Sequence, residues 1–126
     1  MAGITTAMCT SFKKELMQAI HDFTASTGDT FKIALFKTSI AGTYGAATVN
    51  YSDMTGNSDE VANGSGYTTG GNTLTNVTPT TSGTTAFADF SDTSWSSASF
   101  SCTGCMIYNS SDSNKAVSVH DCVDSE

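Results

Sequence analysis

The sequence predicts a mainly β domain, an antiparallel β-sandwich or partly open barrel of about six or seven short strands, with one N-terminal amphipathic α-helix. Short segments of alternating apolar and polar residues recur between clusters of Gly, Ser, Thr and Asn. One segment alone has helical periodicity, so the crossover helices of a parallel sheet are not expected. The length of 126 residues fits a single domain, residues 1–126, with the helix at about 9–24 and the sandwich at about 30–123.

The helical segment has apolar residues spaced by three and four positions. They are Cys9, Phe12, Leu16, Ala19, Ile20 and Phe23. Thr10 or Ser11 is expected to cap the start of this helix, and Gly28 lies just past its end. We expect the stripe to pack on the domain's own sheet and to be required for folding. The alternative is a partner-binding face formed by Phe12, Leu16, Ile20 and Phe23.

The densest apolar run, residues 30–37, is the strongest strand prediction and the expected centre of the core. Phe31, Ile33 and Leu35 fall on one face at a period of two. Residues 47–51 predict a weak short strand, whereas residues 53–71 consist mainly of turn-forming residues.

Two hairpins are expected in the second half of the chain. Residues 73–78 and 84–90 alternate in polarity, and Ser82-Gly83 provides a turn between them. Residues 98–108 are apolar on both faces, which is typical of a central strand, and residues 116–123 return beside them.

The charge of the chain excludes several classes of partner. The formal net charge is −7, and all five cations are Lys. Nucleic acid is not an expected partner, because phosphate binding requires a cationic surface. No apolar run is long enough to span a bilayer, so no membrane partner is expected. The first residues do not form a secretory signal, which predicts synthesis in a reducing cytoplasm.

The four cysteines, Cys9, Cys102, Cys105 and Cys122, are expected to be free thiols in such a compartment. Cys102, Cys105 and Cys122 with His120 could instead form a zinc site of three thiolates and one imidazole. A regular strand points positions 102 and 105 to opposite faces, so this site would need a bulge. A disulfide is a further alternative, and buried thiols are the favoured interpretation. We therefore expect no structural metal.

Residues 53–71 contain two further patterns. Acidic and amide side chains in this segment supply the hard oxygens of a calcium site, but their spacing fits no EF-hand loop. They are Asp53, Asn57, Asp59 and Glu60. The glycines of residues 60–71 suggest a phosphate loop, but no Lys follows them and no helix is expected to begin there. A solvated loop with tight turns is the favoured interpretation of both patterns.

No catalytic residue, cofactor or metal ligand is assigned from the sequence, and the protein is expected not to be an enzyme. His21 falls on the predicted helix and His120 on a late strand, and both could equally face solvent. Because Ser and Thr are abundant, a Ser-His-Asp combination has no meaning without geometry. Trp95, the one Trp, is expected to plug the core or its rim; a sugar-binding platform is the alternative.

A series of short strings runs along nearly the whole chain. They are residues 11–16 (SFKKEL), 28–35 (GDTFKIAL), 60–61 (EV), 66–71 (GYTTGG), 74–75 (LT), 85–90 (TAFADF), Trp95, 107–109 (IYN) and 114–117 (NKAV). In order and spacing they resemble a family of small virion proteins of tailed bacteriophages. The family tends to have small or apolar residues, not Cys, before the Ile107 string, which weakens the zinc hypothesis. It also tends to continue into another strand, whereas this chain stops at Glu126.

The resemblance implies a non-enzymatic structural component, a decoration or cement protein on the capsid exterior that is made in the host cytoplasm. The implied partners are the major capsid protein and neighbouring copies of the chain, in a trimer or other small oligomer. Two alternatives remain open: another virion component, such as a neck, tail or fibre-attachment protein, and a free carbohydrate-binding module. An exposed row of aromatic side chains would favour the module.

Overall fold

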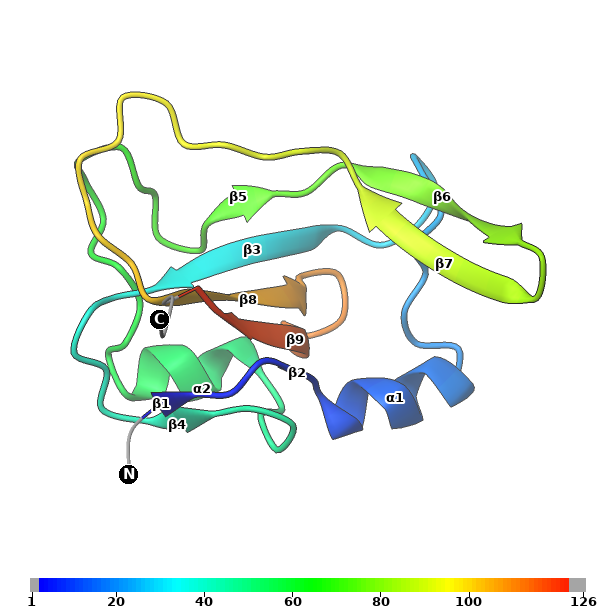
Figure 1. The fold of residues 1–126 in the computed structure, drawn as a ribbon, viewed down its shortest axis with the longest axis horizontal. Coiled ribbons are helices and arrows are strands. Elements are labelled where there is room, and N and C mark those ends of the chain that lie inside the picture. Colours follow the sequence, from blue (N-terminus) through cyan, green and yellow to red (C-terminus); the bar gives the residue numbers. More distant parts are fainter. Residues whose placement is uncertain (1–2, 123–126) are drawn as a thin grey trace.

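The computed structural model describes residues 3–122 and has the predicted fold class, a mainly β, sandwich-like domain (Figure 1). Within these residues there are nine short strands and two helices, which is one helix more than expected. In chain order they are β1 (Gly3–Ile4), β2 (Ala7–Met8), α1 (Thr10–Met17), β3 (Phe31–Phe36), β4 (Thr43–Tyr44), α2 (Tyr51–Gly56), β5 (Asn72–Thr73), β6 (Asn76–Ser82), β7 (Thr85–Phe90), β8 (Gly104–Asn109) and β9 (Lys115–Asp121). Neither helix of the described chain is long and apolar enough to cross a membrane.

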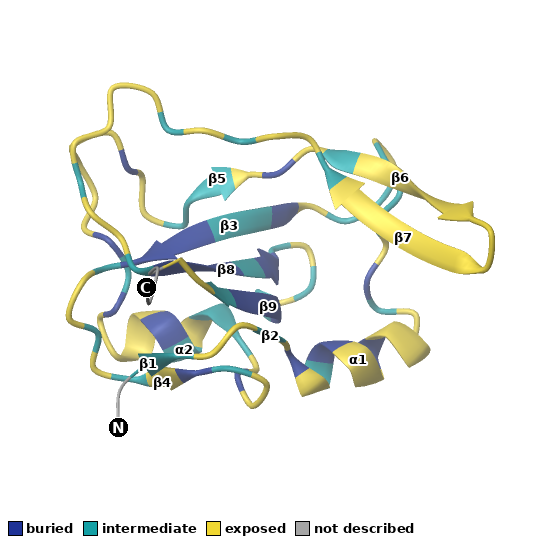
Figure 2. Cartoon of the chain, in the orientation of Figure 1, coloured by how far each residue is buried: buried dark blue, intermediate teal, exposed yellow. Residues whose placement is uncertain are grey.

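The main sheet has five antiparallel strands in the order β2-β9-β8-β3-β5. Ala34 of β3 pairs with Met106 of β8, which pairs in turn with Val119 of β9, so the three side chains share one face. Leu35 and Cys105 pair on the opposite face. All five are buried, so this part of the sheet is covered on both sides, as Figure 2 shows for β3, β8 and β9. The prediction that residues 30–37 form a core strand is confirmed.

Two apolar clusters bury these faces. The larger contains Phe31, Phe36, Met54 and Met106, and residues from α1, α2 and the loops pack around them. The smaller contains Leu35, Val61, Tyr67 and Cys105, with Trp95 and Phe100 packed against it. The two-stranded parallel sheet of β1 and β4 lies beside the main sheet and brings Tyr44 into the larger cluster.

Both predicted hairpins are present, with different bounds. In the second hairpin β8 begins at Gly104 and not at residue 98, and residue 123 of the predicted returning strand lies outside the described residues. Residues 98–103 bond elsewhere: Ser99 N donates to Ser65 O at 2.8 Å, and Thr103 N donates to Phe36 O at 3.0 Å. These bonds hold that segment against a loop and the end of β3 before the ladder with β9 begins.

The prediction of a helix at 9–24 is too long by two turns. Helix α1 ends at Met17, and Ala19 has a φ of 60°. Ile20 N donates to Glu15 O at 3.0 Å, a bond that closes the helix end as in a Schellman motif. Glu15 is buried because His21 turns back to meet its carboxylate. This tertiary contact outweighs the apolar periodicity that continues to Phe23.

Helix α2 replaces the predicted weak strand at 47–51 and the first part of the predicted loop. Its N-cap Asn50 accepts a hydrogen bond from Ser52 N, and Asp53 Oδ2 accepts one from Asn50 N. This reciprocal arrangement is a capping box, which satisfies backbone donors at the first turn. Met54 anchors the helix in the larger cluster. The sequence signal for this helix is the spacing of Asn50 and Asp53, which the predicted strand at 47–51 and the predicted loop from residue 53 divide between two segments.

The first hairpin, β6–β7, is confirmed and projects from the body of the domain as a two-stranded arm, residues 76–90 (Figure 1). Strand β6 continues past residue 78, the predicted end of this strand, and includes Pro79. A register shift between Val77 and Thr80 accommodates this residue, because a bulge removes the need for its missing N–H.

Gly71, the residue before β5, lies so close to β3 that a Cβ would have no room there. Its φ is +84°, and a Cβ at this position would lie 1.8 Å from Ile33 O of strand β3. We expect Gly71→Ala to lower the free energy of unfolding by more than the roughly 1–3 kcal/mol of left-handed strain alone. Gly70→Ala is the matched control, because its φ is +97° but its Cβ would meet only Tyr108 Oη, at 3.5 Å. If urea unfolding gave the same loss of stability for Gly71→Ala and Gly70→Ala, the close contact between Gly71 and β3 would be contradicted.

Candidate functional site

The arm is anchored at its base and exposed over the rest of its length. Asn76 Nδ2 donates to Asp29 O at 2.9 Å, and the ring of Phe90 lies 5.7 Å from that of Phe31 and 6.0 Å from that of Phe23. Every other residue of the two strands is exposed (Figure 2). The two strands pack mainly on each other. A lone two-stranded hairpin is at best marginally stable in water, so the arm is a surface that gains from a partner.

An apolar groove of about 600 Å³ lies between the arm and α1. Phe12 and Leu16 of the helix form one side, Pro79 and Phe87 of the arm form the other, and Ile107 belongs to the sheet strands that line it. Phe87 is 47% exposed and Leu16 is 44% exposed. The two residues of the helix stripe therefore differ. Phe12 is buried in the core, as expected, whereas Leu16 is on the surface, as the alternative of a partner-binding face predicts.

The arm carries almost no charge. Residues 61–88 include no Asp, Glu, Lys or Arg, although the chain as a whole has a net charge of −7. Two acidic surfaces repel each other at short range, and an uncharged segment avoids that cost. The groove and the arm together are thus the part of the described chain best suited to contact another protein surface.

A Ser-His pair lies beside this groove. Ser118 Oγ and His120 Nε2 are 2.9 Å apart on neighbouring same-face positions of β9, and both line the groove. Burial lowers the pKa of His120, which keeps the imidazole neutral at pH 7. A nucleophile also needs an oriented base and donors for an oxyanion, and a contact two residues along one strand is the ordinary result of alternation. We therefore interpret Ser118 and His120 as residues that line the groove and do not assign them a catalytic role.

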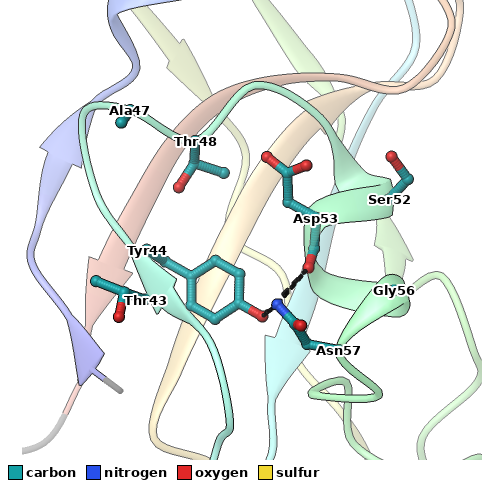
Figure 3. A pocket seen from close by; sticks show the side chains of 8 residues that line it. All are labelled: Thr43, Tyr44, Ala47, Thr48, Ser52, Asp53, Gly56 and Asn57. Atoms are coloured by element: carbon teal, nitrogen blue, oxygen red, sulfur yellow. Dashed lines mark hydrogen bonds between the residues drawn. The ribbon is translucent and has the colours of Figure 1, made fainter. Parts of the chain in front are cut away.

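A second, polar hollow of about 430 Å³ lies between the β4 region and α2 (Figure 3). Tyr44, Asp53 and Asn57 line it, and Asn57 Nδ2 donates to Tyr44 Oη at 3.1 Å and to Asp53 O at 3.1 Å. Burial raises the pKa of Tyr44 to about 12, with a hydrogen bond to Asp59 as the next cause. These groups bond to one another and stabilise the packing of α2.

Asp59 is the buried acid of this region. Tyr44 Oη donates to it at 2.6 Å, and the N–H groups of Ala41 and Gly42 donate at 2.8 Å each. Burial by itself would raise the pKa of Asp59, but these three hydrogen bonds, with the charge of Lys37, outweigh it and lower the pKa.

Because its pKa is lower in the folded state, Asp59 stabilises the fold above its unfolded pKa of about 4, and this stabilisation is lost as pH falls. We expect Asp59→Asn to cost about 1.5–3 kcal/mol at pH 7, the usual value of a hydrogen bond to a charged group. The difference from wild type should shrink below about pH 4. Urea unfolding at pH 7 and pH 3.5 checks this, with the exposed Asp92→Asn as the control. A deficit that does not change with pH would contradict it.

Each of the three acids considered for a calcium site has its own hydrogen-bond partners within the protein. Asp53 caps α2, Asp59 accepts from Tyr44, and Glu60 accepts from Tyr51 Oη at 2.5 Å and from Gly70 N at 2.7 Å. Residues 3–122 contain no group of three or more His, Cys, Asp or Glu placed to hold a metal ion. The favoured interpretation of this segment as a solvated loop is wrong in part, because hydrogen bonds of these acids tie residues 53–71 to the core.

The Gly-rich segment serves the same network. Tyr67 Oη donates to Glu60 Oε2 at 2.5 Å and lies 3.1 Å from Leu35 N, which donates to it. Burial, followed by the hydrogen bond to Glu60, raises the pKa of Tyr67 well above its usual value. Gly70 and Gly71 adopt positive φ values beside it. Turn chemistry, as predicted, accounts for these glycines.

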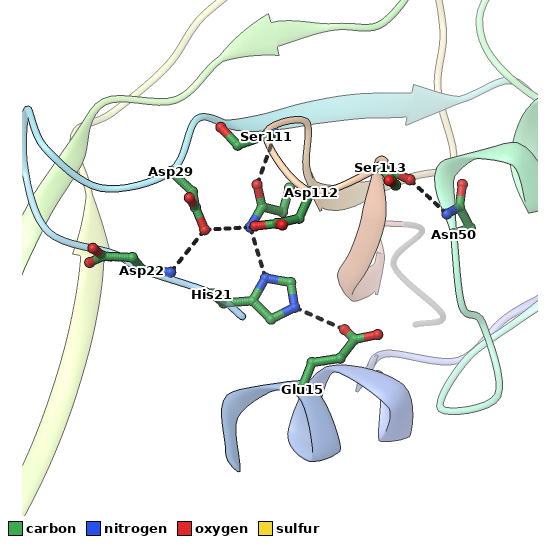
Figure 4. Close-up of polar contacts among 9 residues, drawn as sticks. Glu15, His21, Asp22, Asp29, Asn50, Ser111, Asp112 and Ser113 are labelled. Atoms are coloured by element: carbon green, nitrogen blue, oxygen red, sulfur yellow. Dashed lines mark hydrogen bonds and ion pairs between the residues drawn. The ribbon is translucent and has the colours of Figure 1, made fainter. Parts of the chain in front are cut away.

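His21 belongs to a buried polar network (Figure 4). Asn109 Nδ2 lies 2.8 Å from Asp29 Oδ2, to which it donates, and 2.9 Å from His21 Nδ1. Since this nitrogen must be the amide donor, His21 Nδ1 accepts and the ring proton sits on Nε2, which donates to Glu15 Oε1 at 2.8 Å. The network joins α1, the following loop and the β8–β9 hairpin, and it holds these elements in place.

The aromatic side chains are mostly internal. Tyr51 stacks on Tyr108 with ring centroids 4.4 Å apart, and Trp95 packs over Tyr67 at 6.2 Å. The buried indole Nε1 of Trp95 has no hydrogen-bond partner within the described chain. Trp95 is therefore a plug of the smaller cluster, as favoured, and the exposed aromatic row of a carbohydrate-binding module is not formed by residues 3–122.

The four cysteines are free thiols. Cys9 and Cys105 are buried, whereas Cys102 and Cys122 are exposed, so the buried-thiol interpretation of Cys102, Cys105 and Cys122 is confirmed for Cys105 and is wrong for the other two. The expectation of no structural metal stays a prediction. After dialysis, zinc should be far below one equivalent per chain, and a chelator should leave the melting temperature unchanged. A zinc-to-protein ratio near one would overturn this expectation.

No family model matches this sequence, and no curated protein or solved structure is significantly similar to it.

Proposed function

We propose that this chain is a non-enzymatic structural protein of a tailed-phage virion that binds the outer surface of the assembled capsid as a trimer or other small oligomer. The observation that carries the binding role is the arm over its apolar groove. An exposed arm with Phe87 at its side, opposite Leu16 of α1, forms a surface whose apolar area is removed from water when another protein covers it.

The place of binding follows from the resemblance of the sequence strings to small virion proteins. Net charge of −7 disfavours a position beside packaged DNA, which supports the outer face of the shell. A shell repeats one binding site many times, and an oligomer would engage several of these sites at once. Weak contacts by single arms then add through effective concentration, so a modest affinity per arm is sufficient.

The proposal is tested with phage particles that lack the protein. Purified chain is added to particles from which its gene has been deleted, and bound copies are counted after sedimentation. We expect saturable binding at hundreds of copies per particle, resistant to moderate salt because the contact is apolar. Binding of only a few copies would favour the neck, tail or fibre-attachment alternative, and no binding would reject the virion role.

A further inference from the structure

Three of the four cysteines gather at one end of the β8–β9 hairpin. Cys105 of β8 pairs directly with His120 of β9. The ladder continues beyond β9, because Cys122 N donates to Thr103 O at 2.9 Å. Side chains two residues apart on a strand share a face, so Cys122 lies on the same face as His120 and is the diagonal neighbour of Cys105. Diagonal neighbours across an antiparallel pair lie about 7–8 Å apart, so a bond between two cysteine side chains at these positions requires the chain at Cys122 to move toward β8.

The two thiols interact. The pKa of Cys105 is raised to about 12, chiefly by burial, then by the charge of Cys122 and a hydrogen bond between the two side chains, and least by the charge of Cys102. Burial is the larger cause of the raised pKa of Cys102, and the charge of Cys122 raises it as well. The fourth cysteine, Cys9, lies elsewhere, at the start of α1, with its Sγ 4.0 Å from Gly45 O.

We propose that Cys105 and Cys122 form a reversible disulfide, which fastens the end of β9 to β8 when the protein meets a small-molecule disulfide such as oxidised glutathione. The exposed Cys122 reacts first. Its thiolate attacks one sulfur of the oxidant, a mixed disulfide forms, and one glutathione thiolate leaves. Cys105 then loses its proton and attacks Sγ of Cys122, which releases the second glutathione. Two protein thiols are oxidised, one glutathione disulfide is reduced, and the two protons end on the released thiols.

Burial explains why Cys105 is the resolving partner. Its side chain is shielded from a bulky oxidant and stays protonated until a neighbouring sulfur is activated. Once made, the bond would close a loop across the hairpin and limit the freedom of the unfolded chain. The inference stands apart from the proposed function. A virion protein, however, would keep these thiols reduced during assembly in the cytoplasm and meet oxidants only after release.

The test uses the reduced full-length chain, incubated with oxidised glutathione and then alkylated. We expect intact mass to fall by two hydrogen atoms before alkylation, two thiols to resist alkylation, and digestion to yield a peptide pair joined through Cys105 and Cys122. Dithiothreitol should reverse the change. Cys122→Ser should abolish the bond without unfolding the protein, because the side chain is exposed, whereas Cys102→Ser and Cys9→Ser should retain it.

Three outcomes would overturn the proposal: a bond between Cys102 and Cys122, a glutathione adduct on Cys122 that is never displaced, or disulfide-linked dimers on a non-reducing gel. A second measurement separates a native bond from one formed in unfolded chains. The melting temperature of oxidised wild type should exceed that of the reduced protein, with no such rise in Cys122→Ser. An oxidised protein that melts at a lower temperature would show that the bond distorts the hairpin and would also reject the proposal.

Discussion

Replacement of Phe31 by alanine is expected to lower the free energy of unfolding by about 3–5 kcal/mol, the usual cost of emptying an aromatic site in a core. Phe31 is completely buried at the start of β3. Its ring stacks on Phe23, with centroids 4.4 Å apart and planes 6° from parallel, and contacts Phe90 at the base of the arm. Small domains have about 5–15 kcal/mol of total stability, so the variant should unfold partly near physiological temperature.

The matched control is Phe87→Ala, which removes the same side chain from an exposed position on the arm. Its cost in stability should be about 0.5 kcal/mol or less, the usual limit for surface substitutions. Urea unfolding monitored by circular dichroism measures both variants. Similar losses for the two variants would contradict the assignment of Phe31 to the core and of Phe87 to the surface.

The same Phe87→Ala variant is expected to lose roughly 30-fold in affinity for the capsid, corresponding to the roughly 2 kcal/mol of a typical aromatic hot spot. The reason is that Phe87 is an exposed aromatic side chain beside the groove, and truncation removes apolar area that a partner would cover. Binding to particles that lack the protein, measured over a range of protein concentrations, gives the affinity directly.

Val49→Ala is the control for binding, since Val49 is 50% exposed but lies outside the groove. It should bind like wild type. Because Phe87→Ala is expected to fold normally, weaker binding cannot be attributed to unfolding. Equal affinities for wild type and Phe87→Ala would remove the arm from the interface, and a loss with Val49→Ala as well would place the contact over a wider surface.

The strands of the core were predictable because their pattern is local. Residues 30–37 and the β8–β9 hairpin have apolar residues on both faces, and a turn-forming segment separates the hairpin strands. The end of α1 was not predictable, because the apolar spacing continues to Phe23. The contact that reverses the chain joins Glu15, His21 and Asn109, which are brought together only in the folded state.

The candidate site was predicted in part. The stripe on α1 was assigned to the core, with a partner-binding face as the alternative, and the structure buries Phe12 but leaves Leu16 in the groove. The hairpin at 73–90 was expected as part of the sandwich. It projects from the body because, among the described strands, β6 and β7 pair only with each other and not with the main sheet. The alternation of apolar and polar residues within the hairpin does not show which other strands it pairs with. The uncharged stretch at 61–88 was the available signal.

The most direct test of the proposed function is a density map of the intact virion obtained by cryo-electron microscopy. The proposal predicts copies of this domain on the outer shell in the hundreds, in small symmetric oligomers, with the arm and the groove beside Phe87 covered by capsid protein or by a neighbouring copy. Copies confined to the neck, the tail or a single vertex, or copies on the shell with the arm free in solvent, would contradict it.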